Sequence, residues 1–484
     1  MTTNTPRTEP QATTWFQKMV TGGSRIYLFA VLVSFAFPVA AEVVIYPGHK
    51  PGDLAQFTNL WESQRYAVSV NGKPLTVYAS KNRTGKFIDK QGRNAGVKPG
   101  YIKEAHFCYF SFKDKTVNIV ISSPNGAANL SQATVHPVRH NIPCQVVGGK
   151  ASFKLTSPRK IVIKTIDDEL FPLIILADEP DKDIPSGPNV TRYGPGIHDI
   201  GLKSPVHRDQ TIYIDGGAIV KGTFFSNDKP LKGFTLRGRG ILYAGDYEYI
   251  YGDGSRHILP YGVDDSLIEG CLLVDSPNHN VLANNNSTAE NLKIISFHGT
   301  TDGVHFGPYS TCRDCFVMCN DDVLLAHITG NPDKKSWELF ENCVVWHHDW
   351  GSPFKIIGGP QHDITFRNID IIETGTRHAV FLGQWGGGGD VYNYVFENIH
   401  IERMRPYVKL FDLKPGMGTN RKMYNMTFRN IYAPTAIGTI KGASDSSYID
   451  GIVFDNVVIN GKKIKTIEET GIKVGEHVRN LTVK

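Results

Sequence analysis

Apolar and polar residues alternate in short runs through most of the chain, which is the pattern of half-buried β-strands and not of amphipathic helices. In the first part, the alternating run at residues 66–70 is followed by the pair Asn71-Gly72 and then by Leu75 and Val77. An Asn-Gly pair between two alternating runs is a strong signal for a β-hairpin. Further runs at 116–121, 151–155 and 160–164 continue the pattern. Residues 42–190 are therefore predicted to form a β-sandwich.

Residues 191–484 differ because they repeat. Five segments share the sequence Phe-x-Asn followed by alternating apolar residues, and successive asparagines lie 26, 30, 32 and 26 residues apart, at Asn342, Asn368, Asn398, Asn430 and Asn456. A period of this length that carries strands and no helical stripe is typical of a solenoid built from β-coils. The predicted fold is all-β, with an N-terminal β-sandwich followed by a right-handed parallel β-helix. In it, the aligned asparagines should stack as a ladder of side-chain amides.

The composition favours an all-β fold, and the N-terminus predicts an exported protein. The 48 Gly, 20 Tyr and 25 Phe suit many short strands joined by tight turns. Residues 26–37 form an apolar run that ends in Pro38-Val39-Ala40-Ala41, so residues 1–41 are predicted to be a signal peptide that is cleaved after Ala41. A membrane anchor would need about 17 to 25 apolar residues. We expect a secreted or periplasmic monomer that does not contact a membrane after the leader is removed.

Charge and cysteine content exclude some partners and metals. The formal net charge of the whole chain is only +5, which is too small to favour nucleic acid as a partner. Cys312, Cys315, Cys319 and Cys343 invite a zinc site, but their spacing matches no metal knuckle. The repeat places Cys315 and Cys343 as interior neighbours on consecutive coils, where they act as filler or form a disulfide. No metal and no cofactor is expected.

Two acidic clusters interrupt the apolar rhythm of neighbouring coils. They are Thr301-Asp302-Gly303 and Asn320-Asp321-Asp322, whose first aspartates are 19 residues apart, slightly less than one coil. Adjacent strands lie about 4.8 Å apart, so Asp302 should lie beside the Asp321-Asp322 pair. Three carboxylates this close should have different pKa values, which is what acid and base catalysis of glycosidic cleavage needs. Turn capping and a calcium site are the alternatives.

These clusters, together with Val345-Trp346-His347-His348-Asp349 and Pro353-Phe354-Lys355-Ile356, resemble the catalytic stretch of glycoside hydrolase family 49. That family contains dextranases and isopullulanases and shares a clan with the family 28 polygalacturonases. The resemblance implies a β-sandwich before a right-handed β-helix, and an inverting mechanism. It implies that Asp321 is the general acid and that Asp302 and Asp322 hold and activate the water.

The resemblance leaves the substrate open. Family 49 implies an α-glucan such as dextran or pullulan. The chain departs from family 28 in having Thr301 where Asn is usual and in lacking Gly-His-Gly, and its third coil departs from the family 49 pattern. Lys355 could bind the anionic group of an acidic or sulfated polysaccharide, or it could be a structural lysine. Seven residues are expected at the substrate: His305, His347, His348, Asp349, Trp350, Lys355 and Trp385.

Two other classes of function remain compatible with the sequence. Many polysaccharide lyases are β-helices, although uronate lyases usually use a cationic base and calcium. A non-catalytic glycan-binding β-helix would also have this pattern.

Overall fold

The computed structural model describes residues 43–82, 101–166, 170–249, 256–327, 336–357, 359–385, 389–416 and 420–484, and the predicted signal peptide therefore lies outside the described residues. The secondary structure of these ranges is β-strand, with three short 3-10 turns, η1 (Asp53–Gln56), η2 (Val138–His140) and η4 (Ile467–Thr470). Within them, no helix has the length and apolar character needed to span a membrane.

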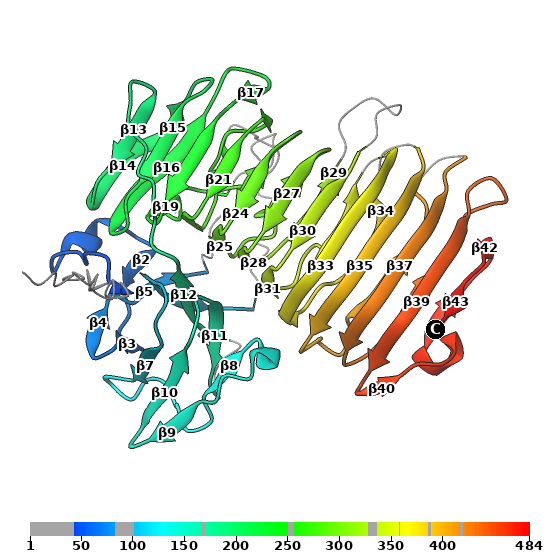
Figure 1. Ribbon diagram of the computed structural model, residues 1–484, viewed down its shortest axis with the longest axis horizontal. Helices are drawn as coiled ribbons and strands as arrows, with labels where there is room; N and C mark the ends of the chain where they lie inside the picture. Colours follow the sequence, from blue (N-terminus) through cyan, green and yellow to red (C-terminus); the bar gives the residue numbers. More distant parts are fainter. Residues whose placement is uncertain are drawn as a thin grey trace, which may run out of the picture. The chain divides into compact units, whose positions relative to one another are not determined.

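Two sheets form the N-terminal β-sandwich (Figure 1). The first sheet consists of β1 (Val43–Val44), β2 (Leu60–Glu62), β5 (Tyr78–Lys81), β6 (Glu104–Phe112), β8 (Thr134–His136), β11 (Lys160–Lys164) and β12 (Leu173–Asp178). The second consists of β3 (Ala67–Val70), β4 (Lys73–Leu75), β7 (Val117–Ser122), β9 (Gln145–Val147) and β10 (Lys150–Leu155). Asn71 and Gly72 connect β3 to β4 with φ angles of 50° and 79°, which are the left-handed conformations that the predicted hairpin requires.

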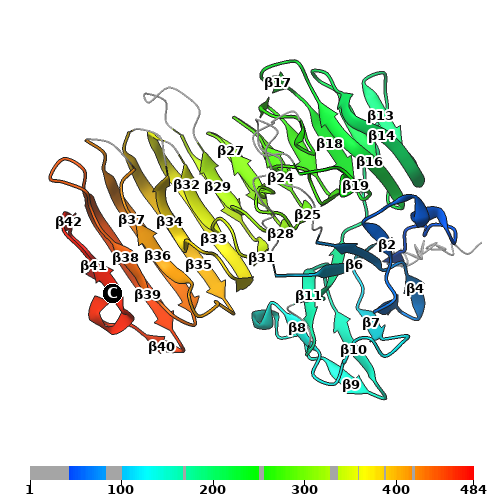
Figure 2. The same ribbon diagram turned by 180° about the vertical axis from the view of Figure 1, so that it is seen from behind.

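The rest of the chain winds into a parallel β-helix, and its coils follow one another along the axis in both views (Figures 1 and 2). The all-β fold predicted from the sequence is confirmed. The strands of successive coils form a 21-stranded sheet and an 8-stranded sheet. The 8-stranded sheet consists of β23 (Val281–Leu282), β26 (Val304–Phe306), β29 (Leu324–His327), β32 (Phe354–Ile357), β34 (Ala379–Trp385), β36 (Lys409–Leu413), β38 (Gly438–Ile440) and β41 (Ile472–Val474).

The 21-stranded sheet begins at β13 and ends at β43. Its strands are β13 (Val190–Tyr193), β14 (Gly196–Pro205), β15 (Thr211–Ile214), β16 (Ala218–Phe225), β18 (Thr235–Gly238), β19 (Ile241–Tyr243), β21 (Leu267–Glu269), β22 (Leu272–Val274), β24 (Thr288–Glu290), β25 (Lys293–Ile295), β27 (Ser310–Arg313), β28 (Phe316–Cys319), β30 (Glu338–Glu341), β31 (Val344–His347), β33 (Gln361–Thr374), β35 (Val391–Ile401), β37 (Met423–Ala433), β39 (Ile449–Ile459), β40 (Lys462–Lys463), β42 (Val478–Arg479) and β43 (Thr482–Val483). The strands β17 (Leu231–Lys232) and β20 (Val263–Asp264) form a separate two-stranded sheet.

The Phe-x-Asn repeat forms two ladders, the predicted ladder of asparagines and a second ladder of phenylalanines. The amide of each asparagine donates to the side-chain oxygen of the preceding one, at 3.1, 2.9, 2.8 and 2.8 Å from Asn368 to Asn456. These asparagines have φ between 53° and 56°, a left-handed conformation that asparagine tolerates better than most residues. Inside the helix the phenylalanines stack, with centroids 4.6 to 5.4 Å apart between Phe340 and Phe454.

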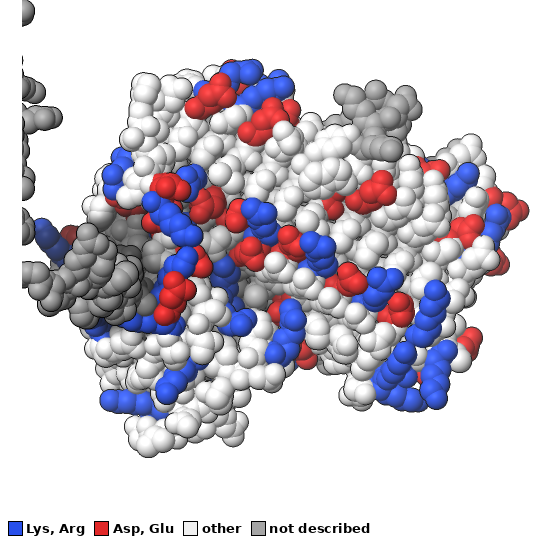
Figure 3. All heavy atoms as spheres, in the orientation of Figure 1, with Lys and Arg blue, Asp and Glu red and all other residues white. Residues whose placement is uncertain are grey.

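The residue between Phe and Asn forms a third ladder, which the sequence analysis missed. The register aligns these positions on successive coils, and their charges alternate from Glu341 to Arg367, Glu397, Arg429 and Asp455. Arg367 pairs with Glu341 at 2.6 Å, and Arg429 pairs with Asp455 at 3.0 Å. Figure 3 shows acidic and basic side chains interspersed along the coils. The alternation avoids like charges facing each other across strands, which would be destabilising.

All seven cysteines are free thiols. Cys312, Cys315 and Cys343 have no exposed surface, and their sulfur atoms lie within 4.8 Å of one another. Cys315 and Cys343 are interior neighbours, as the repeat predicted, and they fill the core as thiols.

The asparagine ladder can be tested at Asn430, which donates to Asn398 and accepts from Asn456. Asn430→Ala removes two hydrogen bonds worth about 0.5 to 1.5 kcal/mol each, and it replaces an asparagine, which tolerates the left-handed region, with an alanine, which occupies that region at a cost of about 1 to 2 kcal/mol. Asn430→Gly removes only the hydrogen bonds. We expect chemical denaturation to give a larger loss of unfolding free energy for alanine than for glycine, and equal losses would contradict the conformational part of this account.

Candidate active site

The three aspartates lie just before strands of the 8-stranded sheet. Val304 pairs with Leu324, and Leu324 pairs with Phe354. Two residues earlier, the same register aligns Asp302, Asp322 and Ser352 on consecutive coils. One oxygen from each of Asp302, Asp321 and Asp322 lies within 4.8 Å of the other two. The proximity that the spacing predicted is therefore present.

Asp302 is held by two histidines. Its side chain is buried, with 5% of the residue exposed. His305 Nε2 donates to Asp302 Oδ2 at 2.6 Å, and His279 Nδ1 lies 3.1 Å from the same oxygen. Burial alone would raise the pKa of Asp302, but the charges and hydrogen bonds of His279 and His305 outweigh burial and lower it. Asp302 is the ionised carboxylate of the group.

Asp322 is held by a lysine and a backbone amide. Lys355, which the sequence analysis placed at the substrate, donates from Nζ to Asp322 Oδ2. The backbone N–H of Ser352 donates to Asp322 Oδ1 at 2.8 Å. Burial raises the pKa of Asp322, while the charge of Lys355 opposes that rise. Burial lowers the pKa of Lys355, but the charge of Asp322 more than compensates, so Lys355 stays protonated.

Asp321 is the most accessible of the three, and its carboxyl group has the fewest polar contacts. Its Oδ1 accepts a hydrogen bond of 3.0 Å from the backbone N–H of Asp322. Burial raises the pKa of Asp321 well above its usual value, and the charges of Asp302 and Asp322 raise it further. A protonated carboxyl beside an ionised one is the arrangement that general acid–base catalysis requires.

Gly351 allows the backbone to approach the aspartates. Its φ is +63°, and a Cβ atom there would lie 2.5 Å from Asp321 Oδ1 and 2.3 Å from the backbone nitrogen of Asp322. Both contacts are shorter than a Cβ can make. Glycine at 351 is therefore required by the conformation and by the space that Asp321 occupies.

His347 and His348 are fully buried. Burial lowers the pKa of His347 to about 4, so its ring is neutral. Its Nε2 donates to the carbonyl of Trp350, and its Nδ1 lies 3.0 Å from Thr374 Oγ1. The ring of His348 packs against Tyr101, 5.5 Å away between centroids. Neither histidine has surface that a sugar could touch in this conformation.

Asp349 and Trp350 belong to a cluster at the surface. Arg377 donates to Asp349 Oδ2 from Nε at 2.9 Å and from a terminal nitrogen at 2.6 Å, and Tyr407 donates to Oδ1 at 2.9 Å. The Arg377 guanidinium lies 4.5 Å from the centre of the Trp350 ring. Trp385 is the last residue of β34, and its side chain lies outside the described part of the chain.

Two side-chain groups near the aspartates could in principle hold a cation. One is the three aspartates, and the other is His279, Asp302 and His305, whose ligand atoms lie within 4.8 Å of one another. In both groups the negative charge already has protein partners, namely Lys355 on Asp322 and the two histidines on Asp302. The protein itself thus supplies the positive charge that a cation would bring.

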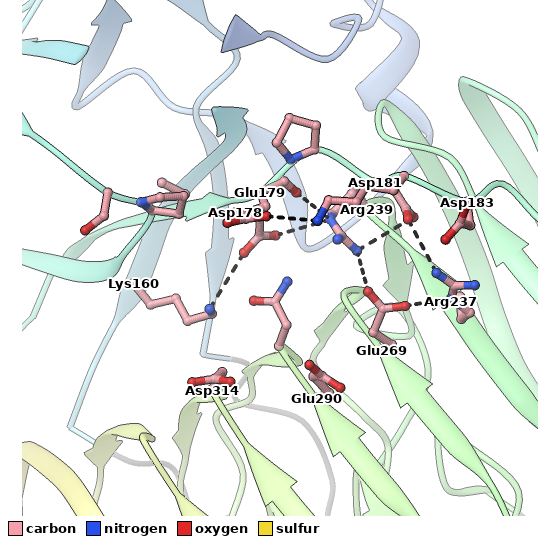
Figure 4. A pocket seen from close by; sticks show the side chains of 16 residues that line it. Lys160, Asp178, Glu179, Asp181, Asp183, Arg237, Arg239, Glu269, Glu290 and Asp314 are labelled. Carbon is pink, nitrogen blue, oxygen red and sulfur yellow. Dashed lines mark hydrogen bonds and ion pairs between the residues drawn. The ribbon is translucent and has the colours of Figure 1, made fainter. Parts of the chain in front are cut away.

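A cavity of about 640 Å³ lies elsewhere, between residues 177–183 and the β-helix, and its lining includes none of the three aspartates. Its charged side chains pair with one another: Arg239 with Glu269 at 3.2 Å, and Arg237 with Glu269 at 2.6 Å (Figure 4). Lys160 and Asp178 lie 3.7 Å apart on the other side. We interpret it as part of the contact between the β-sandwich and the β-helix.

The sequence analysis missed His279 and the partner of Lys355. The signal for His279 was its register. Leu282 pairs with His305, so His279 occupies the position of Asp302 one coil earlier. Lys355 aligns with Leu325 and through it with His305, on the outward face of the strands that follow the aspartates.

Three solved structures are similar to this chain. Dex49A from Penicillium minioluteum superposes with a TM-score of 0.59 at 15% identity, covering 92% of this chain and 97% of that chain. The family 28 exopolygalacturonase from Yersinia enterocolitica gives a TM-score of 0.44 at 13% identity, covering 91% and 98%. The catalytic unit of the GH87 α-1,3-glucanase from Streptomyces thermodiastaticus gives 0.42 at 11% identity, covering 91% and 86%.

The first of these likenesses shows a common fold, so the resemblance to family 49 that the sequence predicted extends to the fold of a family 49 enzyme. No protein-family model matches the chain, and no match to a curated protein was found.

The role of Gly351 can be tested against Gly461, which has φ of +76° with nothing within 4 Å of the Cβ position. Both substitutions to alanine carry the cost of a left-handed residue, about 1 to 2 kcal/mol. Gly351→Ala also overpacks the site, at about 1 to 3 kcal/mol. Denaturation should give the larger loss of unfolding free energy for Gly351→Ala. Equal losses would mean that the site relaxes around the new methyl group.

Proposed function

We propose that the protein is a secreted polysaccharide hydrolase that cleaves O-glycosidic bonds with inversion, with Asp321 as general acid and Asp302 and Asp322 at the attacking water. The observation that carries this proposal is the difference between the three carboxyl groups. His305 and His279 lie against Asp302 Oδ2 and lower the pKa of Asp302, whereas burial and the charges of the other two aspartates raise the pKa of Asp321 well above its usual value. Asp302 can accept a proton from water and Asp321 can protonate the leaving oxygen.

Inversion is proposed in spite of the short separation. Inverting enzymes with two carboxyl groups usually hold them about 6.5 to 9.5 Å apart to leave room for water, and retaining enzymes about 5 to 5.5 Å. Here the nearest oxygens are within 4.8 Å. A double displacement needs only two carboxyl groups, however, and the third carboxyl group, Asp322, gives a water molecule beside Asp302 a second hydrogen-bond acceptor. The resemblance to family 49 also implies inversion.

For the substrate, we propose an α-glucan such as dextran or pullulan, following family 49. One observation favours an acidic or sulfated polysaccharide instead. Burial lowers the pKa of His378, and the charges of Lys355, Lys414 and Lys409 lower it further, against an opposing effect of Asp412. Lys355 lies on the coil after Asp322, and Lys409 and Lys414 lie two coils further along; Lys355 also pairs with Asp322, and Lys414 pairs with Asp412 at 3.5 Å. Release of reducing ends from dextran and pullulan, compared with polygalacturonate and sulfated galactans, tests the two classes.

The acid role predicts the behaviour of Asp321→Asn. Turnover of polysaccharide should fall by about 10²- to 10⁴-fold, because the leaving oxygen is no longer protonated. Substrate binding, measured by calorimetry, should persist. Asp445→Asn changes a side chain that is 92% exposed and serves as the matched control. Unchanged release of reducing ends by Asp321→Asn would exclude Asp321 as the acid.

The pKa of Asp321 predicts the basic limb of the pH profile. Activity requires the protonated acid, so it is lost as the pH rises through the raised pKa of Asp321. The midpoint of the basic limb should therefore lie at a pH above the usual pKa range of carboxyl groups. In Asp322→Asn one of the charges that raise this pKa is gone, and the limb should move to lower pH. A limb that stays in place or moves upward contradicts the assignment.

The stereochemical outcome of cleavage can be measured directly. Proton NMR of the first product formed should show the anomer opposite to that of the cleaved bond, before mutarotation mixes the two. The same anomer as the substrate would indicate a covalent intermediate, as the short carboxyl separation alone would favour. An unsaturated, ultraviolet-absorbing product end would instead identify a lyase.

A further inference from the structure

Asp302 and Asp322 occupy equivalent positions on consecutive coils, but their oxygens are used differently. Both oxygens of Asp322 accept hydrogen bonds, Oδ1 from the backbone of Ser352 and Oδ2 from Lys355. On Asp302, both contacts are made to the same oxygen, Oδ2, which accepts a hydrogen bond from His305 and lies beside His279 Nδ1. Within the described ranges, no protein donor to Asp302 Oδ1 is found.

This difference matters for a base. A carboxylate accepts a proton from water only through an oxygen whose lone pairs are available, and an oxygen that receives a lysine ammonium is a poor acceptor. Asp322 would have to break its contact with Lys355 or Ser352 before it could take a proton. Asp302 can use Oδ1 while Oδ2 remains held.

We infer that Asp302, through Oδ1, is the sole general base of this site, that Asp322 with Lys355 positions the water without accepting its proton, and that His279 and His305 are positioning residues for Asp302. The inference rests on the proposed function, and it divides a role that the family resemblance gives to both carboxylates.

The proton balance of the step closes within the site. The water oxygen forms a bond to the anomeric carbon while its proton moves to Asp302 Oδ1. The bond from the anomeric carbon to the leaving oxygen breaks, and that oxygen takes the proton of Asp321. Asp302 then loses a proton to solvent and Asp321 gains one, which restores the starting state. No cofactor or redox partner is needed.

The histidines form a column over three coils that ends at Asp302. The rings of His257 and His279 are 4.8 Å apart, and those of His279 and His305 are 5.1 Å apart. Burial lowers the pKa of His279, but the charge of Asp302 raises it above the usual value, so His279 carries a proton. Burial and the charges of the other two histidines lower the pKa of His257 well below its usual value, so it stays neutral. The column thus places a positive charge beside Asp302.

The groups that act on Asp302 come from five consecutive coils. His257 and His279 lie on the two coils before Asp302, His305 lies on the same coil, and Asp321, Asp322 and Lys355 lie on the two coils after it. The Cys319 thiol is close enough for Asp302 to raise its pKa, but burial is the larger cause and keeps it neutral. Of these groups, only the two histidines contact Asp302 directly.

The test compares the full-length mature enzyme with Asp302→Asn and Asp322→Asn over a range of pH. Asp302→Asn should lower kcat by about 10²- to 10⁴-fold and remove the acid limb of the profile. Asp322→Asn should keep the acid limb, with its loss shared between kcat and KM. An acid limb that survives in Asp302→Asn, or that disappears only in Asp322→Asn, overturns the inference.

A small anion can replace a missing base. In Asp302→Gly, added azide or formate should restore turnover at least tenfold, whereas Asp322→Gly should not respond, because its carboxylate does not take the proton. Equal rescue of both variants counts against a single base. Oligosaccharide binding by calorimetry reports whether each variant is folded. If Asp302→Gly does not fold, His305→Gln tests the role of Asp302 as the base in its place.

His305→Gln keeps a hydrogen-bond donor but cannot carry charge. With one partner of Asp302 weakened, the pKa of Asp302 should rise and the acid limb should move to higher pH, with KM little changed. An unmoved limb means that His305 is only structural. These outcomes are separate from failure of the proposed function, which would appear as wild-type protein that releases no reducing ends from any of the polysaccharides.

Discussion

The register between consecutive coils determines which side chains meet along the β-helix. In a parallel β-helix each residue has one neighbour above and one below at a distance of one strand spacing, about 4.8 Å, so every side chain is chosen for two partners. The Phe, Asn and charged ladders are three solutions of this constraint, for apolar, amide and ionic side chains. A slip of one residue would place Phe366 against Glu397 and Asn368 against the buried Ile399, and all three ladders would fail together.

The same constraint explains how much could be predicted. The asparagines revealed the coil length because a repeated polar residue in a turn is visible among apolar strands, and the 19-residue spacing then brought the aspartates together. The charge ladder was equally present in the sequence, at the middle position of Phe-x-Asn. It was overlooked because its signs alternate, so that no single residue type occupies the position on every coil. His279 was overlooked because its coil lacks the aspartate that marks the next two.

Side-chain direction was the part that the sequence could not supply. His347, His348 and Asp349 follow one another, and the sequence offers no means of knowing which of them face the core. In the structure both histidines are buried, and Asp349 is bound by Arg377 and Tyr407, which lie 28 and 58 residues further along the chain. Such partners depend on turns between strands, where the period of two no longer applies.

The β-sandwich also contributes to the ordering of the site. Its seven-stranded sheet and the coils from β16 to β33 share one apolar cluster, which includes Tyr109, Leu176, Tyr243 and Trp346. Tyr101 accepts a hydrogen bond of 2.7 Å from the Trp346 indole and packs against His348, two residues further along. The turn from Trp346 to Gly351 therefore has the sandwich on one side and Asp321 on the other. Because Gly351 leaves no room for movement toward Asp321, a shift of the sandwich would be transmitted to the acid. The position of the acid is thus set by packing between the two parts of the fold, whereas the position of Asp302 is set within the β-helix by the histidine column.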